Sequence, residues 1–252
     1  MASRTEIVRY LDAYLDVPRT PDYGPQGLQV EGKEEVRRVA TAVSASLALF
    51  ERAIAWGADL ILVHHGLFWE NTPRVVTGPL RRRLALLLAH EVNLAAYHLC
   101  LDRHPEIGNN VLALRGLGCE ALEPFGEHRG VTIGYRGTLP GGLPLAELTA
   151  RVREFFGREP LVFPYGPDPV HTLGVITGGA QRELTQAIAA GLDAYLTGEA
   201  SEWVMHAAEE ARITYFAAGH YATETTGIRA LGDHVAQRFG VEARFFDLPN
   251  PV

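Results

Sequence analysis

Three groups of side chains in this sequence have the types and the spacing that metal-ion chemistry needs. His64 and His65 directly follow Leu60-Ile61-Leu62-Val63, the most apolar run in the chain. Such a run predicts a buried parallel strand, and open α/β sheets bind ligands at the carboxyl ends of their strands. Histidine is a common metal ligand, and the alternative for this pair is two hydrogen-bonded rings in a turn.

The second group is His98 and Asp102, four residues apart after the apolar run 94–97. In a helical segment the two side chains share a face, and near the sheet edge Asp102 can bind a cation. The alternative for Asp102 is a turn or capping carboxylate. An imidazole in water titrates near neutrality, so His98 can carry protons, or it can hydrogen-bond to a metal ligand.

The third group is His220 and Glu224, again four residues apart, after the apolar run 213–217. One helical turn brings an imidazole and a carboxylate together, as in helix-borne metal sites. The alternative is a hydrogen-bonded pair on the surface. Glu199 and Glu202 also follow a predicted strand, but such residues are commonly solvated caps, and we leave them outside the site.

The elements that must position these groups alternate between strands and helices. The predicted strands are 39–44, 60–63, 94–97, 172–177, 194–197 and 213–217. Helical periodicity or capping signals predict helices near 3–15, 47–56, 79–90 and 183–190. This alternation predicts an α/β fold.

The two halves of the chain repeat this plan. Residues 53–62 (AIAWGADLIL) and 187–196 (AIAAGLDAYL) are identical at six of ten positions. We therefore predict two similar α/β domains, 1–126 and 127–252, that arose from an internal βαβ duplication. His64-His65 then match Gly198-Glu199, and Asp102 lies 118 residues before His220. Ligands at matching strand ends predict one metal site in a cleft between the domains.

Composition narrows the function classes further. The 252 residues carry 23 Lys and Arg against 30 Asp and Glu, a net charge of −7, which argues against nucleic acid as a partner. Two distant cysteines make neither a disulfide framework nor a thiolate zinc site, so we expect a reducing, cytoplasmic location. No apolar stretch reaches the roughly 20 residues that cross a bilayer, so no membrane partner is expected.

The candidate ligands are three imidazoles and two carboxylates. They suffice for a two-metal site if one carboxylate bridges the ions and water completes their coordination. Glu224 is the preferred bridge, because helical spacing ties it to His220. Nitrogen and oxygen donors without thiolate suit Zn, Fe, Mn or Co, two ions per subunit.

With these residues assembled, the chain resembles the Nif-three-like family, also called the GTP cyclohydrolase 1 type 2 family. The motifs that carry the resemblance are Gly27-Leu28-Gln29-Val30, Leu62-Val63-His64-His65-Gly66, Tyr97-His98 with Leu101-Asp102, Ile176-Thr177-Gly178-Gly179, Leu196-Thr197-Gly198-Glu199 and Gly219-His220-Tyr221-Ala222-Thr223-Glu224. The resemblance implies a dinuclear site in which His65 and Asp102 hold one ion, His64 and His220 hold the other, and Glu224 bridges. It also implies a ring-shaped homohexamer whose metal sites face an inner cavity.

Two departures from the family pattern concern the surroundings of this site. Members usually have a threonine after the histidine that matches His98, and this chain has Leu99. Members usually carry Asp-Asn before the Gly-Leu pair. The segment 22–26 (DYGPQ) stands there instead, and we expect this loop, part of the loop 22–32, to contact a different group.

Two functions from different classes follow. The first is a metal-dependent hydrolase, in which metal-activated water opens the ring of a nucleotide or of another phosphorylated small molecule, as a GTP cyclohydrolase would. The second is a non-catalytic metal-binding scaffold or regulatory protein that forms a ring-shaped oligomer. Turnover that disappears on chelation distinguishes the first from the second.

Overall fold

Two compact units make up the structure, a computed structural model that describes residues 2–252. The first unit extends to Leu101 and also contains Gly227–Leu248, and the second comprises Asp102–Thr226 and Pro249–Val252. Each unit is mixed α/β, which confirms the predicted fold class. Across residues 2–252, no helix combines the length and the apolar character that crossing a membrane requires.

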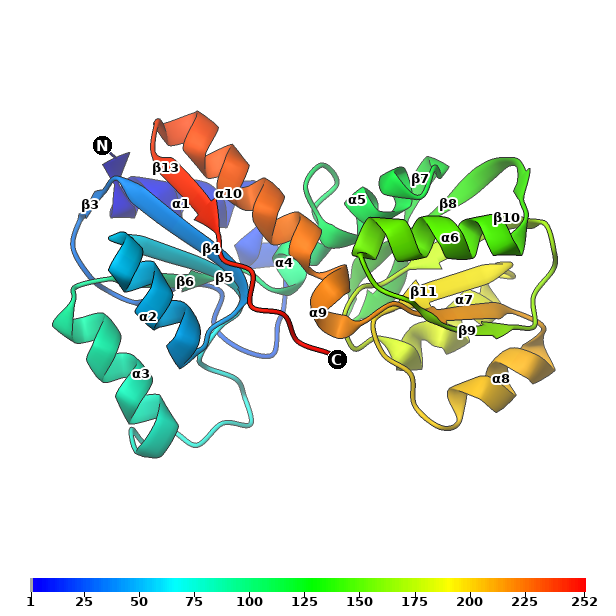
Figure 1. Cartoon of the computed structure of the whole chain (residues 1–252), viewed down its shortest axis with the longest axis horizontal. Helices are drawn as coiled ribbons and strands as arrows, with labels where there is room; N and C mark the ends of the chain where they lie inside the picture. Colours follow the sequence, from blue (N-terminus) through cyan, green and yellow to red (C-terminus); the bar gives the residue numbers. More distant parts are fainter. Residues whose placement is uncertain (1) are drawn as a thin grey trace. The chain divides into compact units, whose positions relative to one another are not determined.

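A five-stranded sheet in the order β13-β4-β5-β6-β2 forms the centre of the first unit (Figure 1). Its strands are β2 (Gly27–Val30), β4 (Arg38–Ser44), β5 (Leu60–His65), β6 (Asn93–Ala96) and β13 (Glu242–Phe245). Strand β2 pairs antiparallel with β6, and the other pairings are parallel. The short strands β1 (Ala2–Ser3) and β3 (Glu35–Val36) pair with each other. The parallel strands direct their carboxyl ends to one edge, which carries His64 and His65.

Helices cover both faces of this sheet. Helices α2 (Leu47–Trp56) and α3 (Gly78–Ala89) pack on one face, against the buried side chain of Ala42 among others. Side chains alternate along a strand, so Thr41 points to the opposite face, where it meets Gly232. That face carries the helices α1 (Arg4–Tyr14) and α10 (Thr225–Phe239). The short helices of this part of the chain are η1 (Val17–Arg19) and α4 (Leu99–Asp102).

The units do not follow the contiguous halves 1–126 and 127–252 that the sequence suggested. The predicted boundary falls inside strand β7 (Glu120–His128), which is hydrogen-bonded within the sheet of the second unit. The C-terminal strand β13 instead pairs in parallel with β4, from Glu242 with Arg38 to Phe245 with Thr41. The chain therefore returns to the first unit, because this edge of its sheet is completed by residues from the far end of the sequence.

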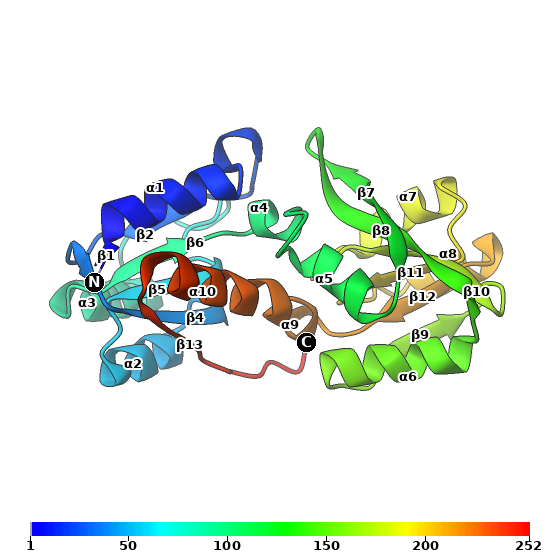
Figure 2. The ribbon, with the colours of Figure 1, turned by 90° about the horizontal axis from the view of Figure 1, so that it is seen from above.

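A six-stranded sheet in the order β7-β8-β10-β11-β12-β9 forms the centre of the second unit. Its remaining strands are β8 (Val131–Leu143), β9 (Leu161–Pro164), β10 (Val170–Val175), β11 (Ala194–Thr197) and β12 (Thr214–Ala217). Helices α5 (Asn109–Gly116) and α6 (Leu145–Phe156) pack on one face, and η2 (Gln181–Glu183), α7 (Leu184–Ala189) and α8 (Val204–Ala211) lie on the other (Figure 2). Helix α9 (His220–Thr223) follows β12.

The two sheets repeat one plan, as the duplicated sequence predicted. Each has three parallel strands in chain order, β4-β5-β6 and β10-β11-β12, with an antiparallel strand beside the third. Asp59 and Asp193 occupy the same position in the aligned segments, and they make corresponding hydrogen bonds in the two sheets. Asp59 accepts two backbone N–H groups at the start of β4, and Asp193 accepts two at the start of β10, all at 2.7 to 3.0 Å.

Strand register fixes which positions of the two halves correspond. Val63 pairs with Ala96 in the first sheet, and Thr197 pairs with Ala217 in the second. His64-His65 therefore correspond to Gly198-Glu199, as predicted. Corresponding residues on the third strands, such as Ala96 and Ala217, lie 121 positions apart, so the 118-residue spacing that matched Asp102 with His220 is wrong. An apolar run by itself leaves its register open, and hydrogen bonding to the neighbouring strand decides it.

Candidate metal centre

The carboxyl end of β5 carries His64 and His65, where the sequence placed them. His64 is fully buried, and its Nδ1 lies 3.0 Å from the backbone carbonyl oxygen of Tyr97. Because a carbonyl oxygen only accepts hydrogen bonds, Nδ1 carries the proton and Nε2 of the neutral ring carries the lone pair. Nδ1 of His65 contacts the hydroxyl of Ser44 at 3.0 Å.

His98 lies beside this pair and is held by the carboxylate of Asp22. Nδ1 of His98 donates to Asp22 Oδ1 over 2.8 Å, and the same carboxylate accepts the backbone N–H groups of Tyr23 and Leu99 at 2.6 and 2.9 Å. Burial acts to raise the pKa of Asp22, but His98 and the backbone donors outweigh it and lower the pKa. The loop whose partner the sequence left open thus supplies a charged group that orients an imidazole ring.

His64, His65 and His98 form an imidazole cluster within the first unit. One ring nitrogen of each lies within 4.8 Å of those of the other two, and the ring centroids are 4.8 to 5.5 Å apart. Because Nδ1 of every ring is engaged by the fold, Nε2 of His64 and of His65 is the nitrogen suited to coordination. Sequence reasoning separated His98 from the other two histidines, and the pairing of β5 with β6 brings it to them.

In the second unit, His220 and Glu224 make the contact that their spacing predicted. Nε2 of His220 lies 3.2 Å from Glu224 Oε1, and the Glu224 side chain is only 3% exposed. Nδ1 of His220 lies 2.5 Å from Glu199 Oε1. Burial acts to lower the pKa of His220, but hydrogen bonds and charge from Glu224 and Glu199 outweigh it and raise the pKa to about 9. Without a metal, the ring is therefore an imidazolium between two carboxylates.

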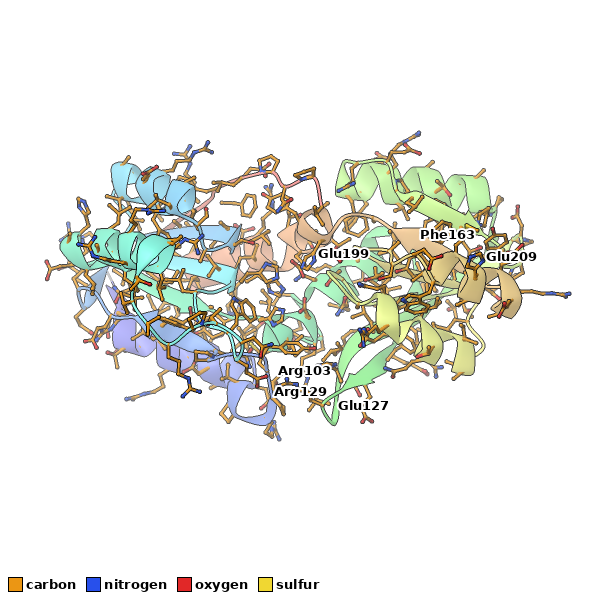
Figure 3. All side chains as sticks on the ribbon, turned by 90° about the horizontal axis from the view of Figure 1, so that it is seen from below. Arg103, Glu127, Arg129, Phe163, Glu199 and Glu209 are labelled. Carbon is orange, nitrogen blue, oxygen red and sulfur yellow. The ribbon has the colours of Figure 1, made fainter. Side chains whose placement is uncertain are left out.

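Glu199 is the residue of this unit that sequence reasoning left out as a solvated cap. Its side chain extends from the segment that follows β11 (Figure 3), and its backbone carbonyl accepts the hydroxyl of Tyr215 at 2.5 Å. One signal was present in the sequence, because the duplication matches Glu199 with His65. A glutamate in that position can orient a ligand histidine instead of acting as a ligand itself.

Asp102, the last residue of α4, is 5% exposed. Its Oδ1 accepts the side-chain amide of Asn109 at 2.8 Å and the hydroxyl of Thr177 at 3.3 Å. Both donors belong to the second unit, as Asp102 itself does, so the structure places Asp102 there and not in the first domain that the sequence assigned it to. Two donors on one oxygen fix the carboxylate in a single orientation.

Glycines let the backbone approach His220 and Glu224 closely. Gly178 has a φ of +72°, and a Cβ there would lie 2.2 Å from Glu224 Oε1 and 3.2 Å from His220 Nε2. A Cβ on Gly198 would lie 2.6 Å from the Cα of His220. The Gly178 N–H donates to the hydroxyl of Thr223 at 3.0 Å, which ties the strand end to α9. These turns therefore accept glycine only, and they form a close wall around the imidazole–carboxylate pair.

The donor set of each unit fits a divalent transition-metal ion. The first unit offers oriented imidazole nitrogens, and the second offers one imidazole and buried carboxylates. Mixed nitrogen and oxygen donors of this kind bind Zn, Fe, Mn and Co. The fold and the site thus define a two-unit α/β protein with candidate metal-binding residues at the strand ends of both units.

The family description Duf34/NIF3 (NGG1p interacting factor 3) matches residues 2–251, and the chain belongs to this family. This confirms the resemblance drawn from the motifs.

Individual relatives span the whole chain. A protein of Pseudomonas aeruginosa named GTP cyclohydrolase 1 type 2 homolog is 47% identical over 246 residues, which cover 98% of this chain and 97% of the relative. The homolog of the same name from Escherichia coli K12 is 41% identical, with 98% and 99% of the two chains covered. Among solved structures, TTHA1606 from Thermus thermophilus is 39% identical with a TM-score of 0.91, covering 99% of this chain and all of the other. Reduced HcgD from Methanocaldococcus jannaschii shares the fold, with a TM-score of 0.86 at 22% identity and 98% of both chains covered.

Proposed function

We propose that this protein is a dinuclear metal-dependent hydrolase that opens the ring of a nucleotide-like substrate. His64, His65, Asp102, His220 and Glu224 would hold two divalent ions per chain. The observation that carries the proposal is the orientation of the histidines, because each has Nδ1 engaged by a group of its own unit. Hydrogen bonds at Nδ1 fix the orientation of the three rings and direct Nε2, as the outer hydrogen bonds of other metal sites do.

The chemistry supplied by bound ions is a lowered pKa of coordinated water, which gives a hydroxide nucleophile near neutral pH. The chain's own residues hold the geometry for it. Asn109 and Thr177 orient Asp102, and Glu199 orients His220. Glu224, almost fully buried, has two carboxylate oxygens and is suited to bridge. His98, whose Nδ1–H is held by Asp22, would take up a proton at Nε2.

The substrate class comes from the relatives. Proteins 39–47% identical to this chain bear the name GTP cyclohydrolase 1 type 2 homolog. Hydrolytic ring opening of a purine begins with water adding at C8 and continues with cleavage of a ring C–N bond. We therefore propose a purine nucleotide or a related phosphorylated ring compound as the substrate.

The decisive experiment counts metals and measures turnover on one preparation. The protein is purified without chelator, loaded with Zn, Mn, Fe or Co, and incubated with a nucleotide panel that includes GTP. We expect two ions per chain and a ring-opened product that disappears after chelation and in His65→Ala. His206→Ala is the matched control, because that side chain is 62% exposed on α8. Fewer than one ion per chain at saturation contradicts the two-metal site. Two ions without turnover of any nucleotide favour the scaffold alternative.

We also propose that the chain forms a ring-shaped homohexamer in the cytoplasm. The family resemblance supports the assembly, and the two buried cysteines, which are not joined in a disulfide, agree with a reducing compartment. Light scattering coupled to size-exclusion chromatography tests the assembly, and a monomer at micromolar concentration contradicts it.

A further inference from the structure

A small pocket in the first unit opens beside the imidazole cluster. Its lining includes Asp22, Gln29, His64, Trp69 and His98. Its free volume of about 10 Å³ leaves room for about one water-sized group. The pocket can therefore receive a single small polar group, while the body of any ligand stays outside it.

Contacts between two segments, residues 23–29 and 67–70, hold the walls of this pocket in place. A Cβ on Gly24 would lie 2.2 Å from the backbone oxygen of Phe68, so the two segments touch backbone to backbone. The Glu70 N–H donates to the carbonyl of Tyr23 at 2.6 Å, and the Leu67 N–H donates to Gln29 Oε1 at 2.8 Å. These bonds join the protein's own residues to one another, so the pocket is preformed.

The orientation of His98 determines what the pocket recognises. Asp22 is a carboxylate that accepts the proton of His98 Nδ1, so Nε2 is a hydrogen-bond acceptor in the neutral ring. An acceptor in a one-group pocket selects a ligand that brings a donor, such as an amino group. Trp69 lies at the same pocket, with its ring centroid 5.1 Å from that of His98 and nearly perpendicular to it. Indole side chains stack on flat heteroaromatic rings.

We propose that this pocket, here called the His98 pocket, binds the exocyclic amino group of a flat heteroaromatic ring that stacks on Trp69. His98 Nε2 accepts from the amino group, and Asp22 is the positioning residue that acts through His98. The inference rests on the proposed function for the presence of a nucleotide-like substrate. It adds the part of the substrate that is recognised and assigns Asp22, His98 and Trp69 to that recognition.

Binding is measured on the metal-loaded full chain with GMP and IMP, whose bases differ by the exocyclic amino group. We expect GMP to bind about tenfold more tightly than IMP, as one hydrogen bond provides. In Asp22→Ala and His98→Ala this preference should disappear. In Trp69→Ala both ligands should weaken on the order of tenfold. Trp203→Ala and His206→Ala are matched controls, being partly or largely exposed at α8, and should bind as the wild type does.

A second measurement separates positioning from folding. The nitrogen NMR shifts of His98 should report the Nδ1–H tautomer in the zinc-loaded wild type and a tautomer mixture in Asp22→Ala, with metal content unchanged. Equal binding of GMP and IMP by the wild type, or a preference that survives in His98→Ala, overturns the inference even if nucleotides are hydrolysed. Preferential GMP binding without any turnover contradicts the proposed hydrolysis but still supports the proposed His98 pocket.

Discussion

Replacing Gly178 by alanine tests how tightly the backbone surrounds Glu224. The added Cβ would lie 2.2 Å from Glu224 Oε1, so the carboxylate has to retreat by about 1 Å to reach ordinary contact distance. Metal–oxygen bonds are about 2.0–2.2 Å long, so a retreat of this size breaks one. We expect metal affinity to fall on the order of 10–100-fold, as when support for a ligand is lost.

The same substitution strains the backbone, because φ at Gly178 is +72°. An alanine in the left-handed region costs about 1–2 kcal/mol relative to glycine. Gly191→Ala is the matched control, since its φ is +64° and no atom lies within 4 Å of the added Cβ. Both variants should lose similar stability from the backbone, and only Gly178→Ala should also lose metal.

The assay combines urea unfolding of the metal-free proteins with competition for zinc against a chromophoric chelator. The expected result is a lower unfolding midpoint for both variants and a weaker zinc constant for Gly178→Ala only. If Gly178→Ala binds zinc as tightly as Gly191→Ala, Glu224 is not a ligand or its carboxylate has room to move. The first outcome would refute the assignment of Glu224 as a ligand, and the second would refute the close wall that we describe.

Four further results are expected. Asp59→Ala and Asp193→Ala each remove an acceptor of two backbone N–H groups, so each should lower the free energy of unfolding by about 1–3 kcal/mol in urea titrations. The pKa of His220, raised to about 9, means that binding of an ion displaces a proton, so zinc affinity measured by calorimetry should rise with pH up to about pH 9. In the metal-free protein, protonated His220 contributes stability that is fully present below pH 6.5 and is lost as the pH rises through about 9; Glu199→Gln should shrink that pH dependence. Burial raises the pKa of Cys119 to about 12, so alkylation followed by mass spectrometry should modify it only in urea.

Local sequence patterns predicted a buried strand, a helix start and one contact of the candidate site. The apolar run before His64 predicted a buried strand, because only a strand covered on both faces is apolar throughout. Ser3 predicted the start of the first helix, and its side chain accepts the N–H of Glu6 at 3.1 Å. The four-residue spacing of His220 and Glu224 predicted their contact. Each of these inferences depends on neighbours within a few residues, which a sequence displays directly.

Partners from distant segments escaped prediction. Asp22 meets His98 across 76 positions, and nothing in the composition of its loop distinguishes an orienting carboxylate from a turn residue. The sequence position of Glu199 is typical of a solvated cap, and only the fold brings it into contact with His220, 21 positions away. The predicted domain boundary failed for the same reason, because the pairing of β13 with β4 joins residues about two hundred positions apart.

The sequence by itself determined the kinds of donor atom and the strand ends that carry them, because periodicity and side-chain chemistry are local properties. Only the tertiary structure decided which nitrogen of each imidazole is engaged, since that depends on the carbonyl, hydroxyl or carboxylate that folding brings to it. The tertiary structure also decided that the chain returns to its first sheet. An apolar strand could join several sheet edges, and hydrogen bonds between strands select one of them.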